Sequence, residues 1–476
     1  MSEKFDLIVI GAGSGGLVSA LGANYLGAKV LLIEKGKLGG DCLNYGCVPS
    51  KALIRSAHVA HAIKNAKNFG ISVEKSSIDF SAVITRVQNI IQNIATTHDS
   101  KERFESLGIR VIMGTSTFLN SHEVLLNDKT YFGKKIVIAT GGRANRPNIE
   151  GLEKTGYLTN EELFSIKKSP KSLIILGGGA IGSEMAQAFS RLGVQVTIVD
   201  KSSTILSRED TDVAEVIMKK FKREGIQIEV NALPIKVHTD GTQKYVTIQQ
   251  NGENKILQAE EILVALGRKP NIEGLQLEAA GVKYDKKGIQ VNSHQQTSKK
   301  HIYACGDICG PFLFTHMASY QAGIIVKNAF TPLSAKASYH AFPWCTFLDP
   351  EVAHVGLSEK QVTEQGIFHT IHKSPVSTVD RARADGENEG FIKIILGKKG
   401  KILGVTIVAP HAGELLAEYT LAMNKGLKIQ DIYDTIHIYP TMSELNKFGA
   451  SQYMKTLFSP FMKTFLGWWN GFEKNK

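Results

Sequence analysis

Two cysteines that lie five positions apart offer the clearest chemistry in this sequence. Cys42 and Cys47 fall within the segment GDCLNYGCVPSK, residues 40–51. Directly after Lys51, the apolar periodicity of residues 52–63 predicts a helix. Because a helix N-terminus stabilises a thiolate, cysteines in this place are expected to be reactive.

Three kinds of site use a close cysteine pair. A zinc site needs two further ligands, and although His58 and His61 are near in sequence, there is no second cysteine pair. The other cysteines, Cys305, Cys309 and Cys345, are too few and too scattered for an extracellular disulfide framework. We therefore favour a redox-active disulfide and expect no bound metal, with a structural bridge or a zinc site as the alternatives.

A glycine-rich segment precedes the cysteines, and a second segment of the same form occurs later in the chain. In each copy an apolar run leads into Gly-x-Gly-x-x-Gly, and a helical stretch and a second apolar run follow. An acidic residue stands eighteen positions after the third glycine in both copies. The first copy has Gly11, Gly13, Gly16 and Glu34, and the second has Gly177, Gly179, Gly182 and Asp200. This repetition predicts two βαβ units that each bind a dinucleotide, rather than glycine-rich turns in ordinary α/β units.

Each residue type in the pattern has a physical reason. The first glycine permits a tight turn, the second lets the backbone approach a pyrophosphate, and the third allows close helix–strand packing. The pyrophosphate then lies at a helix N-terminus, and the acid accepts hydrogen bonds from a ribose. Because Asp200 would bond a 2′-hydroxyl and repel a 2′-phosphate, we expect NAD(H) in preference to NADP(H). Lys201, which follows it, could accept a 2′-phosphate and keeps NADP(H) as the alternative.

Composition and charge exclude several other classes of protein. The 476 residues suffice for about three domains, and no apolar run reaches the roughly 18–20 residues of a membrane span. The net charge is +11, yet the sequence has no helix-turn-helix, zinc-finger or aromatic RNA-binding pattern, so we expect no nucleic-acid partner. The N-terminus leads straight into an apolar run without a cleavable leader, which predicts a cytoplasmic protein.

The segment around the cysteines resembles the active-site segment of class I pyridine nucleotide–disulfide oxidoreductases. These include lipoamide dehydrogenase, glutathione reductase and mercuric reductase. The family's other motifs resemble three further segments, in the same order: ATGG at 139–142, ILVALGRKP at 262–270 and IYACGD at 302–307. The resemblance covers nearly the whole chain.

This resemblance implies an α/β fold of two Rossmann-like dinucleotide-binding domains and a C-terminal α+β dimer-interface domain. We expect an FAD-binding domain at 1–149, an NAD(P)-binding domain at 150–270, a central segment completing the FAD domain at 271–340 and a dimerisation domain at 341–476. The protein would then be a homodimer that contains FAD.

The resemblance also implies which residues bind the cofactors. Besides the first glycine copy and Glu34, the FAD contacts would be Gly114, Thr140, Gly141, Asp307, Leu313, Phe314, Thr315 and His316. Gly267 would join the second glycine copy at the nicotinamide nucleotide. Glu184 would pair with Lys51 beside flavin N5, where the carboxylate compensates a buried ammonium; the alternative is a surface ion pair.

The implied reaction carries electrons from NAD(P)H through the flavin to the cysteines. NAD(P)H passes hydride to the flavin, which reduces the Cys42–Cys47 disulfide through Cys47. Cys42 then faces the acceptor as the interchange thiol. Lipoamide dehydrogenase runs the same path in reverse.

One position departs from the pattern of the disulfide-reducing members. These carry a proton-transferring histidine before a proline, supplied by the other subunit, and a glutamate that orients it. Here the segment is HIYPTMSE, so His437 and Glu444 are in place but Tyr439 replaces that histidine. A phenol is a poor general base at pH 7, so efficient lipoamide or glutathione turnover is not expected. Mercuric reductases also carry this tyrosine, but with a C-terminal cysteine pair, and no cysteine follows Cys345 here.

These features predict an FAD-dependent NAD(P)H oxidoreductase with a mercuric-reductase-like core and an unidentified small-molecule acceptor. A quinone, a metal ion or a small thiol compound would suit. One alternative is a dihydrolipoyl dehydrogenase in which His437 or Tyr439 serves as the base. Another, from a different class, is a flavin redox sensor or membrane-docked binding protein with little turnover.

The C-terminal tail, residues 454–476, is rich in aromatic residues. It reads MKTLFSPFMKTFLGWWNGFEKNK, with two tryptophans, four phenylalanines and basic flanks. The tail is too short to span a bilayer. It could contact a membrane peripherally as an interfacial amphipathic segment, or it could pack on the dimer.

Overall fold

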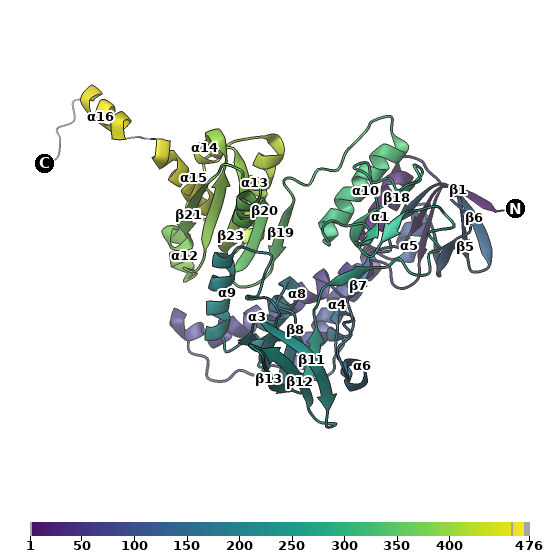
Figure 1. The fold of residues 1–476 in the computed structure, drawn as a ribbon, viewed down its shortest axis with the longest axis horizontal. Helices are drawn as coiled ribbons and strands as arrows, with labels where there is room; N and C mark the ends of the chain where they lie inside the picture. The colour runs from purple at the N-terminus through teal and green to yellow at the C-terminus, as the bar shows by residue number, and fades with distance from the viewer. Residues whose placement is uncertain (1, 458–459, 471–476) are drawn as a thin grey trace. The chain divides into compact units, whose positions relative to one another are not determined.

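The protein is described by a computed structural model that covers residues 2–457 and 460–470. The chain forms two compact units (Figure 1). The first comprises residues 1–205 and 224–338, and the second comprises 206–223 and 339–476. Within the described ranges, no helix is long and apolar enough to cross a membrane.

The first unit contains a seven-stranded sheet built around the first glycine copy. Its order is β3-β2-β1-β6-β5-β4, with β18 beside β6, and β1, β2, β3, β6 and β18 pair in parallel. The strands are β1 (Glu3–Ile10), β2 (Val30–Glu34), β3 (Arg110–Met113), β4 (Ser116–Phe118), β5 (Glu123–Leu126), β6 (Lys129–Ile138) and β18 (Ile302–Ala304). Helices α1 (Ser14–Tyr25) and α10 (Thr315–Phe330) share one apolar core with this sheet.

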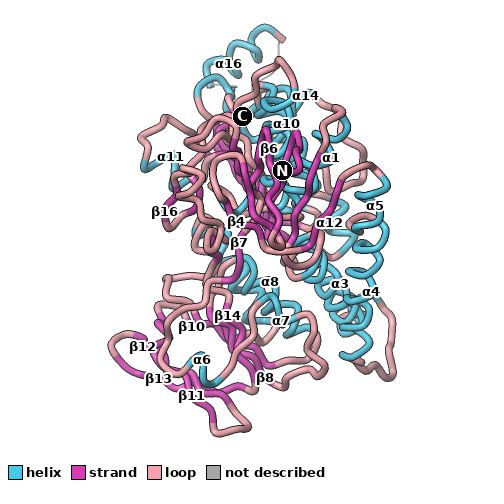
Figure 2. The backbone as a smooth tube through the Cα atoms, turned by 90° about the vertical axis from the view of Figure 1, so that its right-hand side faces the viewer, coloured by secondary structure: helices cyan, strands magenta, loops and turns pink. Residues whose placement is uncertain are grey.

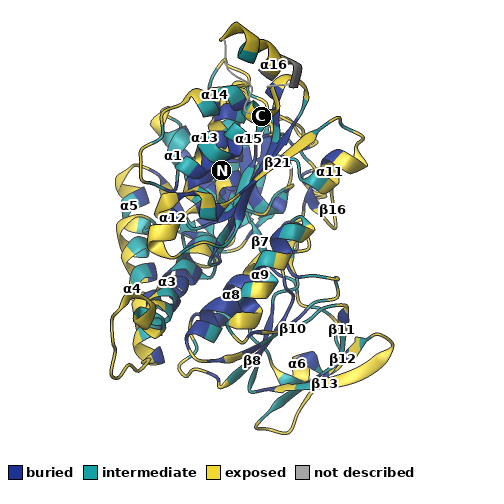
Figure 3. Ribbon diagram, turned by 90° about the vertical axis from the view of Figure 1, so that its left-hand side faces the viewer, coloured by how far each residue is buried: buried dark blue, intermediate teal, exposed yellow. Residues whose placement is uncertain are grey.

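A second parallel sheet of the same unit surrounds the second glycine copy. Its order is β10-β9-β8-β14, and a three-stranded antiparallel sheet, β11-β12-β13, shares its core (Figure 2). The strands are β8 (Ser172–Leu176), β9 (Gln195–Val199), β10 (Gln227–Glu229), β14 (Glu261–Val264), β11 (Ala232–Thr239), β12 (Lys244–Gln250) and β13 (Glu253–Ala259). Helix α8 (Ala180–Arg191) follows β8 and is buried along most of its length after an exposed first turn (Figure 3).

Helices connect the two sheets of this unit. The cysteine segment forms α2 (Gly40–Asn44) and α3 (Cys47–Lys64), and α3 packs beside α4 (Phe80–Thr97) and α8. Helix α3 begins five residues before the periodic stretch starts, because Pro49 sits in its first turn, where a proline is tolerated. The short strands β7 (Gly142–Ala144) and β15 (Arg268–Pro270) pair antiparallel, at the two places where the chain passes between the seven-stranded and four-stranded sheets.

The second unit is a five-stranded antiparallel sheet with helices packed on it. The order is β19-β20-β23-β22-β21. The strands are β19 (Pro343–Thr346), β20 (Glu351–Gly356), β21 (Thr370–Pro375), β22 (Phe391–Leu396) and β23 (Ile402–Ala409), and the longer helices are α9 (Thr211–Arg223), α13 (Ala412–Lys425) and α15 (Glu444–Leu457). The fully buried Lys393 of β22 binds Asp210 and Asp212, each at 2.8 Å. These ion pairs hold residues 206–223 to this unit.

The remaining α-helices and strands are short. They are α5 (Lys101–Ser106), α6 (Leu152–Thr155), α7 (Asn160–Leu163), α11 (Glu359–Glu364), α12 (Asp380–Asp385), α14 (Ile429–Asp434), α16 (Pro460–Trp469), β16 (Tyr284–Asp285) and β17 (Gly288–Ile289). Of the predicted tail, residues 458–459 and 471–476 lie outside the described residues. The predicted α/β class is confirmed, since both glycine copies form parallel βαβ units and an antiparallel α+β unit follows.

Candidate active site

The two cysteines lie where the N-termini of two helices meet. Cys47 is the first residue of α3, and Thr315 is the first residue of α10. The Cys47 sulfur lies 3.3 Å from the Thr315 hydroxyl oxygen, and both cysteines are free thiols. Since both helices direct the positive ends of their dipoles here, this position favours an anion.

The local electrostatics shift the pKa values of the two thiols in opposite directions. A hydrogen bond from Cys42, helped by the Thr315 hydroxyl and the charge of Lys51, lowers the pKa of Cys47 to about 6. The same hydrogen bond, together with burial, raises the pKa of Cys42 above its usual range. At neutral pH the arrangement therefore favours a thiolate at Cys47 and a protonated thiol at Cys42.

One turn after Cys47, an ion pair connects α3 with α8. Lys51 Nζ lies 2.8 Å from Glu184 Oε2, so the structure brings together the two residues that the family resemblance pairs. The Glu184 side chain is only 7% exposed, unlike that of a surface ion pair. The pair therefore links the first turns of α3 to α8.

The first glycine copy has the geometry that a pyrophosphate requires. Gly11 has φ of +103°, and a Cβ there would lie 2.4 Å from the Ala139 carbonyl oxygen. A Cβ at Gly16 would lie 1.8 Å from the Gly11 carbonyl oxygen, so neither position accepts a side chain. Gly13 caps α1 without a side-chain hydrogen bond, which leaves the first-turn N–H groups to an anion.

The second copy repeats this geometry 166 positions later, as Gly177 follows Gly11. Gly177 has φ of +109°, and a Cβ at Gly182 would lie 1.9 Å from the Gly177 carbonyl oxygen. Gly179 caps α8, again without a side-chain hydrogen bond. Because both glycine-rich segments have this geometry, the residues present fit two bound dinucleotides.

The two acids also occupy equivalent places. Glu34 accepts the N–H groups of Ala12 and Gly36, each at 2.7 Å. Asp200 accepts those of Gly178 and Ser202, also at 2.7 Å each. A carboxylate has about four lone-pair positions, so each acid keeps acceptor capacity for ribose hydroxyls.

The remaining predicted FAD contacts lie on the same unit. Gly114 donates its N–H to the Glu34 carbonyl at 2.8 Å, which places it beside the end of β2. Thr140 donates its hydroxyl to the Asn271 carbonyl, and Gly141 accepts the Asn271 N–H. Leu313, Phe314 and His316 flank Thr315 at the start of α10, Asp307 lies in the 3₁₀ turn Gly306–Ile308, and Gly267 immediately precedes β15.

The sequence interpretation missed two polar residues that contact the cysteine segment. Arg268 binds Asp41 and Asp307, and its side chain is only 13% exposed. Asn160 donates to Asp41 and to the Tyr45 carbonyl. Because Arg268 directly follows the predicted nucleotide contact Gly267, the sequence offered a reason to single it out. Nothing in the local sequence distinguishes Asn160.

In the second unit, Tyr439 and Glu444 do not bond each other. The Tyr439 hydroxyl donates to Asp380 Oδ2 at 3.3 Å. Glu444 Oε2 is buried and has no hydrogen-bond partner among the described residues. The ring nitrogens of His437 face Glu418 at 3.1 Å and the Thr435 carbonyl at 3.0 Å. His437 is thus engaged within its own unit.

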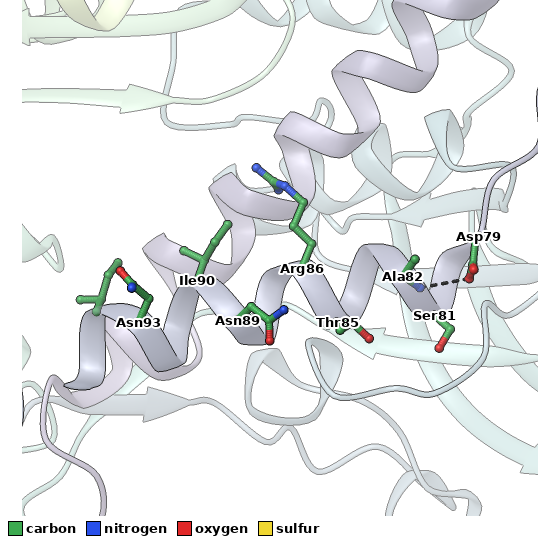
Figure 4. Close-up of a pocket in the computed structure, with 9 residues that line it drawn as sticks. Asp79, Ser81, Ala82, Thr85, Arg86, Asn89, Ile90 and Asn93 are labelled. Atoms are coloured by element: carbon green, nitrogen blue, oxygen red, sulfur yellow. Dashed lines mark hydrogen bonds between the residues drawn. The ribbon is translucent and has the colours of Figure 1, made fainter. Parts of the chain in front are cut away.

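A metal-binding cluster and a surface hollow are two further kinds of candidate site. Within the described part of the chain, no group of three or more His, Cys, Asp or Glu residues is placed to hold a metal ion. A hollow of about 900 Å³ runs along one face of α4 and contains none of the predicted site residues (Figure 4). It is lined by Asp79, Ser81, Ala82, Thr85, Arg86, Asn89, Ile90, Asn93 and Ile94.

The tail helix α16 exposes aromatic side chains. Phe465, Trp468 and Trp469 are 48%, 76% and 72% exposed. The Phe465 ring lies 6.1 Å from that of Trp468 and 6.4 Å from that of Trp469, measured between centroids. The three rings therefore form one accessible cluster.

Comparison with known proteins agrees with the site. The family model of pyridine nucleotide-disulphide oxidoreductases matches residues 5–323, and the model of their dimerisation domain matches residues 342–447. A mercuric reductase of Bacillus cereus is 35% identical over 446 residues, which are 92% of this chain and 70% of that protein. A dihydrolipoyl dehydrogenase of Geobacillus stearothermophilus is 36% identical over 452 residues, 92% of this chain and 94% of that protein.

A solved structure is similar over the same extent. It is the Cu(II) complex of the HOCl-induced flavoprotein disulfide reductase RclA from Escherichia coli, with a TM-score of 0.85 and 28% identity. The match covers 94% of this chain and 99% of that one. By the matched models and these relatives, the chain belongs to the pyridine nucleotide-disulphide oxidoreductases, a family of enzymes that use FAD and pyridine nucleotides.

Proposed function

We propose that this protein is a homodimeric, FAD-containing NAD(P)H oxidoreductase whose electrons leave through the Cys42–Cys47 dithiol. The observation that carries the proposal is the place of the cysteine pair: Cys47 begins α3, its sulfur lies 3.3 Å from the Thr315 hydroxyl oxygen, and its pKa is lowered while that of Cys42 is raised. The two glycine loops of the same unit support binding of two dinucleotides, and the dimerisation-domain match supports the homodimer.

The residues of this chain would divide the work as follows. When bound, FAD supplies the two-electron chemistry of the site. The N-termini of α1 and α8 bind the pyrophosphates, and Glu34 and Asp200 orient the riboses. Lys51, compensated by Glu184, brings positive charge to the start of α3. Cys42 keeps the proton that must leave before its sulfur can attack an acceptor.

For the acceptor, we propose a thiophilic metal ion in preference to a disulfide. The segment that would supply a proton relay offers none: Tyr439 bonds Asp380, and both His437 nitrogens face acceptors. Thiolates are soft ligands and bind such ions without a relay. The relatives named mercuric reductase and the Cu(II) complex of RclA support this choice. Dihydrolipoyl dehydrogenase activity is the second candidate, favoured by relatives of that name.

For the donor, we expect anaerobic reduction of the flavin to be about tenfold faster with NADH than with NADPH, measured by stopped flow at subsaturating coenzyme. Asp200→Asn keeps the carboxamide oxygen as an acceptor but removes the charge that repels a 2′-phosphate. The preference should therefore shrink several-fold in this variant. Lys201→Ala is the matched control and should leave the rate with NADH unchanged. A wild type that prefers NADPH, and loses this preference in Lys201→Ala, would contradict the assignment to Asp200.

We also propose that the tail contacts a bilayer of anionic lipids. The tail, residues 454–476, carries four lysines and one acidic residue, and the match to the dimerisation domain ends before it, at residue 447. Exposed tryptophan and phenylalanine beside lysine suit the headgroup region. A chain that ends at Ser459 should sediment with phosphatidylglycerol vesicles about tenfold less than the full chain, with its flavin retained. If the shortened chain instead becomes monomeric, the tail serves the dimer and this proposal is wrong.

A further inference from the structure

Asp41, the residue before Cys42, is bound by two side chains from other elements. Asp41 Oδ2 lies 3.1 Å from Arg268 Nη1, and Asp41 Oδ1 accepts the Asn160 side-chain amide at 3.0 Å. Arg268 comes from β15 and Asn160 from α7, more than a hundred residues from the cysteines. Asp41 is therefore anchored to two elements that are not part of its own segment.

Asn160 also closes the loop between the cysteines. Its amide nitrogen donates to the Tyr45 carbonyl at 3.1 Å as well as to Asp41, while the Tyr45 N–H donates to the Asp41 carbonyl at 2.8 Å. Asn160 itself is buried, and a capping box of Thr159 and Glu162 fixes the first turn of α7. One side chain with a defined position thus binds both ends of the segment 41–45.

Arg268 extends the connection to the predicted flavin segment. Its Nε donates to Asp307 Oδ2 at 3.0 Å, and its Nη2 donates to the Gly142 carbonyl at 2.8 Å. A guanidinium suits this place because its rigid fork can bind two carboxylates and a carbonyl at once. A continuous chain of contacts therefore runs from Asp41 through Arg268 to Asp307.

The two cysteines differ in what fixes them. Cys47 begins an eighteen-residue helix, α3, whereas Cys42 lies in the five-residue helix α2. A disulfide requires the sulfurs to come within about 2.0 Å, and they separate again on reduction. The position of Cys42 thus depends on what holds the segment 41–45.

We propose that Arg268 and Asn160 form a brace that positions Cys42 for thiol–disulfide exchange and ties it to the flavin segment at Asp307. The inference rests on the proposed function of the dithiol and names positioning residues for it. In the exchange with a small disulfide as the probe acceptor, Cys42 loses its proton to solvent and its sulfur attacks the disulfide, which breaks the S–S bond and releases one thiolate. The Cys47 thiolate then attacks the Cys42 sulfur of the mixed disulfide, so that the Cys42–Cys47 disulfide forms and the second thiolate leaves with the remaining electron pair.

The test compares Asn160→Ala with a matched control, Asn24→Ala. Asn24 also donates its side-chain amide to a backbone carbonyl, that of Leu107. It lies outside the cysteine segment and is not part of the brace. A looser Cys42 should lower the effective concentration of one thiol at the other about tenfold. The midpoint potential of the dithiol, measured against a glutathione buffer, should then rise by about 30 mV.

Turnover gives a second readout. With the small disulfide DTNB as acceptor, kcat of Asn160→Ala should fall about tenfold, while anaerobic flavin reduction by NADH stays within about twofold of wild type. Asp41→Asn, which removes the ion pair with Arg268 but keeps the shape of the side chain, should shift both quantities in the same direction. Asp41→Asn also provides the test on its own if Asn160→Ala fails to fold. Asn24→Ala should match wild type.

The outcomes separate the brace from the proposed function. A wild-type potential and wild-type DTNB turnover in both variants would overturn the brace. Loss of flavin content and of flavin reduction in step with turnover would show a purely structural role and would overturn it as well. If the wild-type protein itself takes up electrons only into its flavin, the dithiol function fails, whatever the variants do.

Discussion

Replacing Cys47 with serine is expected to lower turnover with DTNB by about a thousandfold while flavin reduction by NADH continues. The reason is that Cys47 is the thiol held beside Thr315 at the start of α3 with its pKa lowered to about 6, so it is the natural partner of the flavin. The measurement is steady-state DTNB reduction alongside anaerobic stopped flow. Ferricyanide, which can take electrons directly from a flavin, is the control acceptor and should retain most of its turnover.

The spectra of the two cysteine variants give an independent check. The wild type, reduced by two electrons, should show a long-wavelength charge-transfer band from the Cys47 thiolate to the flavin. Cys47→Ser should lack this band, whereas Cys42→Ser, which cannot form the disulfide, should show it without any reductant. Because the pKa of Cys47 is lowered to about 6, the band should persist at neutral pH and fade as the pH falls below about 6. A band that survives Cys47→Ser would reverse the assignment of the two thiols.

The substitution Tyr439→His is expected to raise DTNB and lipoamide turnover at pH 7 by about a hundredfold. General acid–base help is typically worth 10²–10⁴-fold, and a histidine is well matched to pH 7 where a phenol is not. Glu444 Oε2 is buried without a hydrogen-bond partner among the described residues, so this oxygen has unused acceptor capacity for the new imidazole. The pH profile of kcat should move from a rise at alkaline pH toward a plateau near neutrality.

Tyr439→Phe is the matched control for this gain. It removes the hydroxyl bonded to Asp380 but adds no base, so its turnover with both acceptors should stay within about twofold of wild type. Reduction of Hg(II) or Cu(II) should change little in either variant, because a metal ion needs no proton relay. Fast lipoamide turnover by the unmutated protein at pH 7 would contradict the proposed acceptor class and favour a dihydrolipoyl dehydrogenase.

The geometry of the two glycine-rich segments could be predicted from the sequence because the constraints on their glycines are local. Gly11 and Gly177 must adopt positive φ, and Gly16 and Gly182 must leave room for a carbonyl oxygen one turn away. Such constraints act within one strand–turn–helix unit, so a pattern of glycines and one acid is enough to predict them. The reactivity expected for the cysteines follows likewise from their place near a helix start.

Local sequence patterns did not predict which distant side chains tertiary packing would bring together. The pairing of Lys51 with Glu184 was anticipated only through the family resemblance, since the two residues are 133 positions apart. No local pattern pairs Arg268 or Asn160 with Asp41, or sends the Tyr439 hydroxyl to Asp380. Likewise, only packing shows that Lys393 draws Asp210 and Asp212 into the second unit.

The sequence by itself thus predicted the repeated dinucleotide loops and the reactive cysteine pair, because each depends on residue types at short, fixed spacing. The family resemblance added that Tyr439 stands where other members carry a histidine. Only the tertiary structure decided which distant side chains hold Cys42 and which partner Tyr439 takes. The physical reason is that a hydrogen bond or an ion pair requires atoms within about 3–4 Å. For residues more than a few helical turns apart, that distance is set by how whole elements pack.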